Sequence, residues 1–168
     1  MLKLPVVNKG ITFTEIPDHI TVFFEIGGCK MKCKGCHSPY LHTCIAHDLY
    51  TTIEDMKAYV EDQKAKGANA IVLMGGTWNH GVDTQTLVDI IKELSKILPV
   101  GIFSGLPCGA AIHHKVLRYI EELQWLKIGD YKEALGGLDS PTTNQRFYTR
   151  CSPWGEWEDC THLFQKGV

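Results

Sequence analysis

The chain has 168 residues, a formal net charge of -2 and a hydrophobic fraction of 44%. These values are typical of one globular domain with its own hydrophobic core. The weak charge gives no reason to expect nucleic acid or an anionic membrane as a partner, and no apolar run approaches the roughly 20 residues that a membrane span needs. The N-terminal apolar stretch is too short for a signal peptide, so we expect a cytoplasmic protein whose cysteines stay reduced.

Four short apolar runs, partly β-branched, have the composition of strands that are covered on both faces. They are Ile20–Ile26, Ala70–Met74, Pro99–Phe103 and Trp125–Ile128. The last part of the chain is rich in Gly, Pro, Thr and aromatic residues, which predicts loops and a small antiparallel addition. We therefore expect a single domain over residues 1–168, with a core at about 20–130 and a loop-rich extension at about 131–168.

Three helices are predicted among these strands from apolar residues at helical spacing. Thr51 and Glu54 have the spacing of a capping box, and the helix that follows ends at Gly67. A second helix begins at Asp83 or Thr84 and is stopped by Pro99, with an inward face of Leu87, Val88, Ile91, Leu94 and Leu98. A third covers roughly Ala110 to Gln124, with an inward face of Ile112, Val116, Leu117, Ile120 and Leu123.

The alternation of strands and helices predicts an α/β fold with a parallel sheet and right-handed crossovers. In such sheets ligands bind at the carboxyl ends of the strands. A cysteine-rich loop follows the first predicted strand, and Gly75-Gly76 follows the second. We therefore expect these two stretches to lie close together in space.

Three of the seven cysteines lie within eight positions, at the spacing Cys29-x3-Cys33-x2-Cys36. The glycines and lysines around them are not the surroundings of a cysteine that merely fills core space. A redox pair at Cys33 and Cys36 would leave Cys29 without a role. Zinc is the stronger alternative, because His37 or Cys44 would complete four ligands at spacings that zinc sites use.

The remaining interpretation is a four-iron cluster held by three thiolates. Soft thiolate ligands select iron–sulfur clusters, and cluster ligands occur at similarly tight spacings. The neighbouring glycines would let the backbone wrap closely around the cluster and direct N–H groups at its sulfurs. The fourth iron would then be open to a ligand that does not come from the protein.

With this motif in the loop after the first strand, the sequence resembles the radical S-adenosylmethionine (SAM) enzymes. In that family the amino and carboxylate groups of SAM bind the open iron, and a Gly-Gly-Glu-Pro-like turn after the second strand binds the methionine end. The matching stretch here is Met74-Gly75-Gly76-Thr77, with Thr77-Trp78 in place of the acidic residue and the proline. The resemblance implies a reduced, partial (β/α) barrel with a mainly parallel sheet. It also implies iron ligation by Cys29, Cys33 and Cys36, and backbone contacts of Gly75, Gly76 and Thr77 with SAM.

Within this family the short chain is similar to the activases of glycyl radical enzymes, particularly the activating protein of anaerobic (class III) ribonucleotide reductase. Gly28 and Gly35 precede the first and third cysteines, and His37 directly follows the last, as in that subfamily. Residues 126–131 and 143–148 also resemble its C-terminal part.

That resemblance implies an enzyme in which a reduced [4Fe-4S] cluster passes one electron to SAM. The 5′-deoxyadenosyl radical that results removes a hydrogen atom from a glycine of the partner reductase. The alternatives are another small radical SAM enzyme, such as the activase of a different glycyl radical enzyme or a modifier of small molecules, and a zinc-binding interaction module.

Several polar residues near the predicted ligand edge are further candidates. Ser104 ends the third predicted strand and Lys127 lies on the fourth, where either would contact the ribose or carboxylate of SAM, and a loop hydroxyl and a solvated lysine are the alternatives. A lysine group, Lys30, Lys32 and Lys34, is a solvated face that would also attract an acidic electron donor such as flavodoxin.

The remaining cysteines carry no clear prediction of a site. Cys151 and Cys160 are candidates for a disulfide or for a second metal site, but the sequence supplies no two further metal ligands nearby. We therefore expect them, like Cys108 and Cys44, to be ordinary thiols. Adjacent residues on a helix face different ways, so His113 and His114 are not expected to bind one metal. Two tryptophans of the tail, Trp154 and Trp157, are expected either at a partner surface or packed on the sheet edge.

Overall fold

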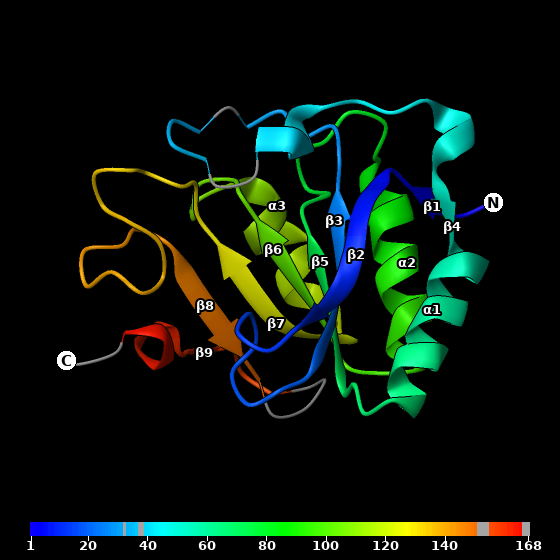
Figure 1. Cartoon of the computed structure of the whole chain (residues 1–168). Helices are drawn as coiled ribbons and strands as arrows, with labels where there is room; N and C mark the ends of the chain where they lie inside the picture. Colours follow the sequence, from blue (N-terminus) through cyan, green and yellow to red (C-terminus); the bar gives the residue numbers. More distant parts are fainter. Residues whose placement is uncertain (32, 37–38, 151–154, 166–168) are drawn as a thin grey trace.

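The computed structural model describes residues 1–31, 33–36, 39–150 and 155–165. A seven-stranded sheet, in the order β2-β3-β5-β6-β7-β8-β9, runs through the molecule (Figure 1). Its strands are β2 (Val6–Thr12), β3 (Thr21–Ile26), β5 (Ala70–Met74), β6 (Val100–Ser104), β7 (Leu123–Ile128), β8 (Arg146–Thr149) and β9 (Glu158–Asp159).

The four predicted strands form the centre of this sheet and are parallel to one another, as β3, β5, β6 and β7. The sheet as a whole is mixed, because β2 pairs antiparallel with β3 and the C-terminal β8 and β9 are added antiparallel beyond β7. The small antiparallel addition predicted for the C-terminal part is thereby confirmed. A partial barrel of the radical SAM type stays a prediction, as does the single-domain organisation.

The N-terminal strands were not predicted from the sequence. Strand β2 lies at the edge of the large sheet, and β1 (Lys3–Leu4) forms a separate two-stranded antiparallel sheet with β4 (Thr51–Thr52). Asn8 and Lys9 interrupt the apolar pattern of β2 and are exposed. An edge strand tolerates such residues because one of its sides faces solvent, and the strand signal in the sequence is correspondingly weak.

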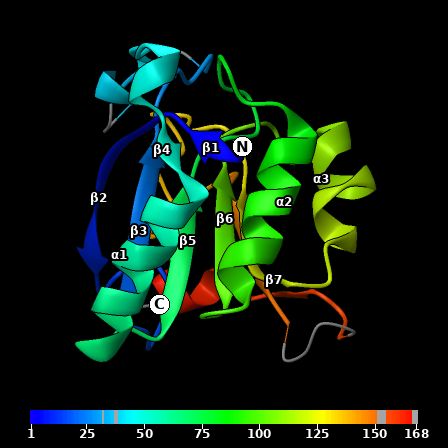
Figure 2. The same ribbon diagram turned by 90° about the vertical axis from the view of Figure 1, so that its right-hand side faces the viewer.

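Helices α1 (Ile53–Ala65), α2 (Thr84–Ser95) and α3 (Ala111–Lys115) lie over one face of the sheet (Figure 2). The capping-box prediction at Thr51 is wrong by one residue, because the side chain of Thr52 accepts the backbone N–H of Asp55 at 3.2 Å. Asp83 caps α2 as predicted, accepting the N–H of Thr86 at 2.8 Å. None of the helices in the described part of the chain has the length and apolarity that crossing a bilayer requires.

The predicted third helix is much shorter than expected. It ends after Lys115, where Val116 leaves helical geometry at φ -125° and ψ -66°, and a 3-10 turn at Leu117–Tyr119 follows. A short turn at residues 120–122 then leads into strand β7, which begins at Leu123. Arg150 donates to the carbonyls of Ile120 and Leu123, so a side chain satisfies the groups that helical hydrogen bonds would otherwise need.

The two faces of the sheet are covered differently. Apolar residues on one face pack against the helices, whereas the opposite face is covered by the segment before β3 and by the C-terminal region. Strand alternation places Met74, Phe103 and Lys127 on this second face, and the strand register pairs Met74 with Phe103 and Phe103 with Lys127. These three side chains thus form a row at the carboxyl ends of the strands, where the candidate site lies.

Candidate metal centre

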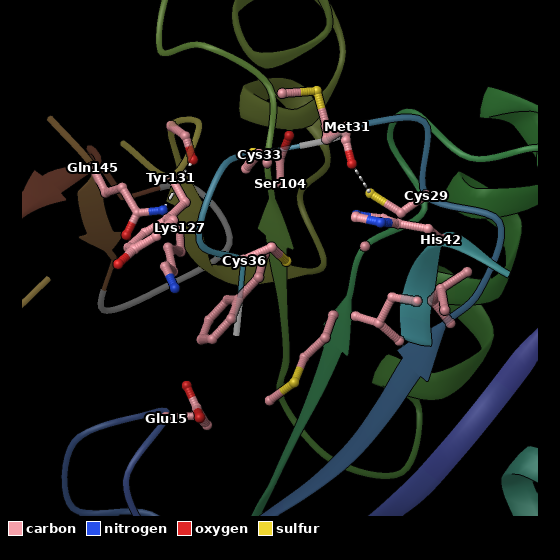
Figure 3. A pocket seen from close by; sticks show the side chains of 17 residues that line it. Glu15, Cys29, Met31, Cys33, Cys36, His42, Ser104, Lys127, Tyr131 and Gln145 are labelled. Atoms are coloured by element: carbon pink, nitrogen blue, oxygen red, sulfur yellow. Dashed lines mark hydrogen bonds between the residues drawn. The ribbon is translucent and has the colours of Figure 1, made fainter. Parts of the chain in front are cut away.

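A cavity of about 330 Å³ lies at the carboxyl ends of the central strands (Figure 3). All three clustered cysteines, Cys29, Cys33 and Cys36, line it. Gly75 and Ser104 line it from the ends of β5 and β6. Two segments that lie about forty residues apart in the sequence therefore meet in one site, as predicted from the strand order.

The start of the cysteine loop is fixed on two sides by its backbone. On one side the N–H of Cys29 donates to the carbonyl of Leu41 at 2.8 Å. On the other side the loop pairs with the turn after β5, where the N–H of Lys30 donates to the carbonyl of Trp78 at 2.9 Å and the N–H of His80 to that of Gly28 at 2.8 Å. The loop is thus held against the Gly-Gly turn by main-chain contacts that place few demands on side chains.

The Gly-Gly turn has a conformation that favours glycine. Gly75 and Gly76 have φ values of +104° and +105°, a region that other residues rarely adopt. A Cβ atom at Gly76 would also lie 3.0 Å from Leu87 of α2. The turn therefore brings bare backbone close to the cavity, as a ligand that binds through main-chain groups requires.

The three cysteines carry reduced thiols, not disulfides, and are half-buried. Burial raises the pKa of the Cys29 thiol, a contact with the carbonyl of Met31 opposes that effect, and the nearby Cys33 and Cys36 raise it further. Several thiolates at such close quarters repel one another unless a metal compensates their charge, so this group of cysteines favours a bound cation.

The positions of the candidate ligands bear on the choice between a four-iron cluster and a single zinc ion. Within residues 1–31, 33–36, 39–150 and 155–165, no three His, Cys, Asp or Glu side chains converge as ligands of one metal ion. A zinc ion needs its ligands around one point, whereas a four-iron cluster takes each thiolate at a different iron. Three thiols around a common cavity are the ligands that a four-iron cluster with one open iron would use. Cys44, one of the two proposed fourth zinc ligands, is exposed and does not line the cavity, and the other, His37, lies outside the described residues.

Comparison with protein families agrees with this geometry. The model of a family described as "4Fe-4S single cluster domain" matches residues 19–145, which include every residue that lines the cavity except Glu15. The chain belongs to the 4Fe-4S single cluster domain family. Neither the curated proteins nor the solved structures contain a significant match to the chain.

The iron–sulfur assignment gives the other lining residues their context. Lys127 projects toward the cavity with its ammonium 4.8 Å from the ring centroid of Phe103, and Figure 3 shows it on the side away from Cys29 and His42. Burial lowers the pKa of Lys127, and the carboxylate of Glu15 opposes that effect. No hydrogen bond to the ammonium occurs in the described part of the chain, so this 4Fe-4S domain holds a poorly compensated cation beside its cysteines.

Ser104 lines the cavity, but its hydroxyl is already occupied. Its oxygen lies 2.6 Å from Nε2 of His113 and 2.8 Å from the hydroxyl of Thr77, and the N–H of Leu106 approaches at 3.4 Å. Gly76 and Thr77 are the predicted site residues of the described chain that do not line the cavity. Thr77 is instead connected to it through Ser104.

Sequence reasoning missed several lining residues, namely Glu15, Met31, His42, Tyr131 and Gln145. Gln145 lies in a stretch that resembles the activases, which was the one signal available for it. Asn79 was also missed. It is buried at 6% exposure, and an isolated antiparallel bridge joins it to Cys29.

Among the described residues, Cys44, Cys108, Cys160 and Trp157 do not line the cavity. Cys108 contacts the carbonyl of Asn144 at 3.3 Å, and burial raises the pKa of its thiol. Cys160 is buried in the core opposite the helices. Trp157 packs on Arg150 at 4.3 Å and donates to the carbonyl of Arg118, which matches the prediction of packing at the sheet edge. Cys151 and Trp154 lie outside the described residues.

Proposed function

We propose that the chain is a radical SAM activase, which cleaves SAM reductively at its [4Fe-4S] cluster and generates the glycyl radical of an anaerobic ribonucleotide reductase. The observation that carries this proposal is that Cys29, Cys33 and Cys36 line one cavity with Gly75, the first glycine of the turn after β5. Three protein thiolates leave one position of a four-iron cluster for an outside ligand. The turn beside them offers backbone groups to such a ligand.

Each part of the site has a distinct role in this proposal. The three cysteines would ligate iron, and the bound cluster would supply the electron that breaks the carbon–sulfur bond of the SAM sulfonium. Gly75 and Gly76 would hold the methionine end through their backbone. Lys127 is half-buried and has no hydrogen-bond partner among the described residues. It would contribute its ammonium to the carboxylate of SAM, because a desolvated cation is costly unless an anion binds to it.

A protein substrate is supported by the shape of the site. A second hollow of about 520 Å³ adjoins the cavity and extends along the face that the helices leave uncovered. The two hollows share five lining residues, Glu15, Cys36, Lys127, Tyr131 and Gln145. An opening of this kind would admit a glycine-bearing loop of a partner up to the cluster.

Lys30 and Lys34 lie in the cysteine loop, and we propose that they form part of the surface that meets an acidic electron donor such as flavodoxin. Lys32 lies outside the described residues. The proposal also places the protein in the cytoplasm, where thiols stay reduced and such donors work. Raising the ionic strength should slow reduction of the cluster by the donor while leaving reduction by dithionite unchanged.

Product analysis tests the SAM chemistry. The protein would be purified without oxygen, reconstituted with iron and sulfide, reduced with dithionite and incubated with SAM. We expect 5′-deoxyadenosine from the wild type and from Cys44→Ser, and none from Cys33→Ala. A colourless protein that carries zinc and leaves SAM intact would refute the proposal.

A second experiment tests the partner. The reduced enzyme and SAM would be incubated with an anaerobic ribonucleotide reductase from the same source, and the mixture examined by electron paramagnetic resonance for a glycyl radical. The doublet of a glycyl radical is the expected result. Cleavage of SAM without a radical on the reductase would favour another small radical SAM enzyme with a different substrate.

A further inference from the structure

A chain of hydrogen bonds runs from the helix side of the sheet to the Gly-Gly turn. His113 of α3 is completely buried, and its Nε2 lies 2.6 Å from the hydroxyl oxygen of Ser104 at the end of β6. That oxygen lies 2.8 Å from the hydroxyl of Thr77, directly after Gly76. Three elements that are distant in the sequence thus share one polar path beside the cavity.

The direction of these hydrogen bonds follows from the imidazole. Nδ1 of His113 lies 3.4 Å from the carbonyl of Cys108, and a carbonyl only accepts, so Nδ1 carries the ring hydrogen. Burial lowers the pKa of His113, which keeps the ring neutral and leaves Nε2 as an acceptor. Ser104 therefore donates its only hydrogen to His113, and its oxygen is left to accept the hydrogen of Thr77.

This direction determines what Thr77 offers to a ligand. Its hydrogen is committed to Ser104, and its oxygen has no other hydrogen bond within the described chain. A threonine hydroxyl normally rotates and either donates or accepts. Here the oxygen is fixed as an acceptor, which suits a ligand group with hydrogens to donate, such as an ammonium.

We propose that His113 is a positioning residue which, through Ser104, fixes the hydroxyl of Thr77 as an acceptor for the amino group of the SAM methionine moiety. The inference rests on the proposed binding of SAM at this site. It gives Thr77 a side-chain role at the position where related enzymes have an acidic residue. The hydroxyl replaces the carboxylate as the acceptor, and the histidine two residues into α3 supplies the orientation that a carboxylate does not need.

The test compares three substitutions in anaerobically reconstituted protein. SAM is titrated into the reduced protein, and its dissociation constant is taken from the change in the electron paramagnetic resonance signal of the cluster. His113→Leu should weaken SAM binding about tenfold, the loss expected for a hydrogen bond to a charged group. His113→Gln should retain most of the affinity, because its amide oxygen reaches the place of Nε2. His114→Leu, on the same helix but exposed, should bind like the wild type.

Iron content and the signal without SAM separate positioning from structural damage. Both should stay at the wild-type level in the His113 variants if the histidine acts on ligand binding alone. Should His113→Leu fail to fold, Ser104→Ala interrupts the same path with a smaller change and should show the same loss of affinity. Equal affinities of Ser104→Ala and the wild type would overturn the inference.

A double-mutant cycle identifies Thr77 as the end of the path. Thr77→Val should weaken SAM binding, and adding His113→Leu to it should cause no further loss, because the group that His113 orients is gone. Additive losses would show that His113 acts elsewhere. If SAM leaves the signal of the wild-type cluster unchanged, the proposed function itself fails. If the wild type responds and every variant binds SAM equally well, only the role of His113 fails.

Discussion

Asn79 holds Gly76 in place through a hydrogen bond of 2.9 Å from the Gly76 N–H to the side-chain carbonyl of Asn79. The amide group of the same side chain donates to the carbonyls of Ile26 and Gly27, at 3.1 and 2.8 Å. One buried side chain thereby joins the glycine turn to the strand end from which the cysteine loop starts. The relative position of the two halves of the candidate site depends on this residue.

Replacing Asn79 by alanine should destabilise the fold and loosen the cluster. The substitution leaves a buried N–H and two buried carbonyls without their partner, and each such loss costs about 1–3 kcal/mol. We expect a lower midpoint in urea denaturation and a faster release of iron to a chelator. Asn69→Ala is the matched control, because its side chain accepts the N–H of Ile20 at the far end of the strands. It should lower stability with little effect on iron release. Equal rates of iron release in the two variants would contradict the assignment.

The three cavity cysteines should each be required for the cluster. Serine at Cys29, Cys33 or Cys36 removes a soft thiolate ligand, so reconstituted protein should lose most of its bound iron and its brown colour. Cys44→Ser serves as the control, because Cys44 is exposed and does not line the cavity. Iron per chain and visible absorption are the measurements. Loss of iron in the Cys44 variant, with retention in one of the other three, would mean that the ligand set is wrong.

The central strands could be predicted because each is a short apolar run that is buried on both faces. Such runs are typical of buried parallel strands. Their order along the chain predicts that the loops after them lie together at the carboxyl-terminal edge of the sheet. The third helix was overpredicted because its apolar spacing continues past Lys115. Periodicity does not register that Leu123 belongs to a strand, or that Arg150, from the other end of the domain, binds the carbonyls of the intervening turn.

The cysteines and glycines of the site could be predicted from the sequence, because clustered cysteines and a Gly-Gly turn after a strand occur in few kinds of site. Asn79, Glu15 and His113 could not, because each is an ordinary residue that acquires its role from partners distant in the sequence. His113 shows the difference clearly. In the sequence, His113 and His114 could only be considered as a metal-binding pair, which helix geometry argues against. The contact of His113 with Ser104 depends on the packing of α3 against β6, which the local sequence pattern does not encode.

Substituting Lys127 by methionine should stabilise the protein while weakening SAM binding. The ammonium is desolvated and lies over Phe103 without a hydrogen-bond partner in the described chain, so an apolar side chain of similar length should suit this position better. We expect the free energy of unfolding, measured by urea denaturation, to rise by about 0.5–2 kcal/mol, the gain that single stabilising substitutions commonly give. Lys92→Met, at an exposed position of α2, should change neither property. A destabilised Lys127→Met protein would indicate that the lysine serves the fold.

The stability of the protein should fall on acidification in a way that depends on His113. Burial holds the pKa of His113 below its ordinary value of 6.5, and His114 and Arg118 add to the effect. The unfolded chain therefore binds a proton at a pH where the folded chain does not. The stabilisation is fully present above pH 6.5 and is lost as the pH falls from there toward the folded pKa, by at most about 1.4 kcal/mol per pH unit.

His113→Gln removes this titration and keeps an acceptor for Ser104. The difference in free energy of unfolding between wild type and variant should thus shift in favour of the variant between pH 7.5 and pH 5.5, as measured by urea denaturation without oxygen. Acid-induced effects on the cluster occur in both proteins and cancel in the difference. A difference that is constant over this range would mean that folding does not lower the pKa of His113, and a shift in favour of the wild type would mean that the folded imidazole is charged. Nε2 would then donate to Ser104, the hydroxyl of Thr77 would no longer be fixed as an acceptor, and the direction assigned to the whole path would be wrong.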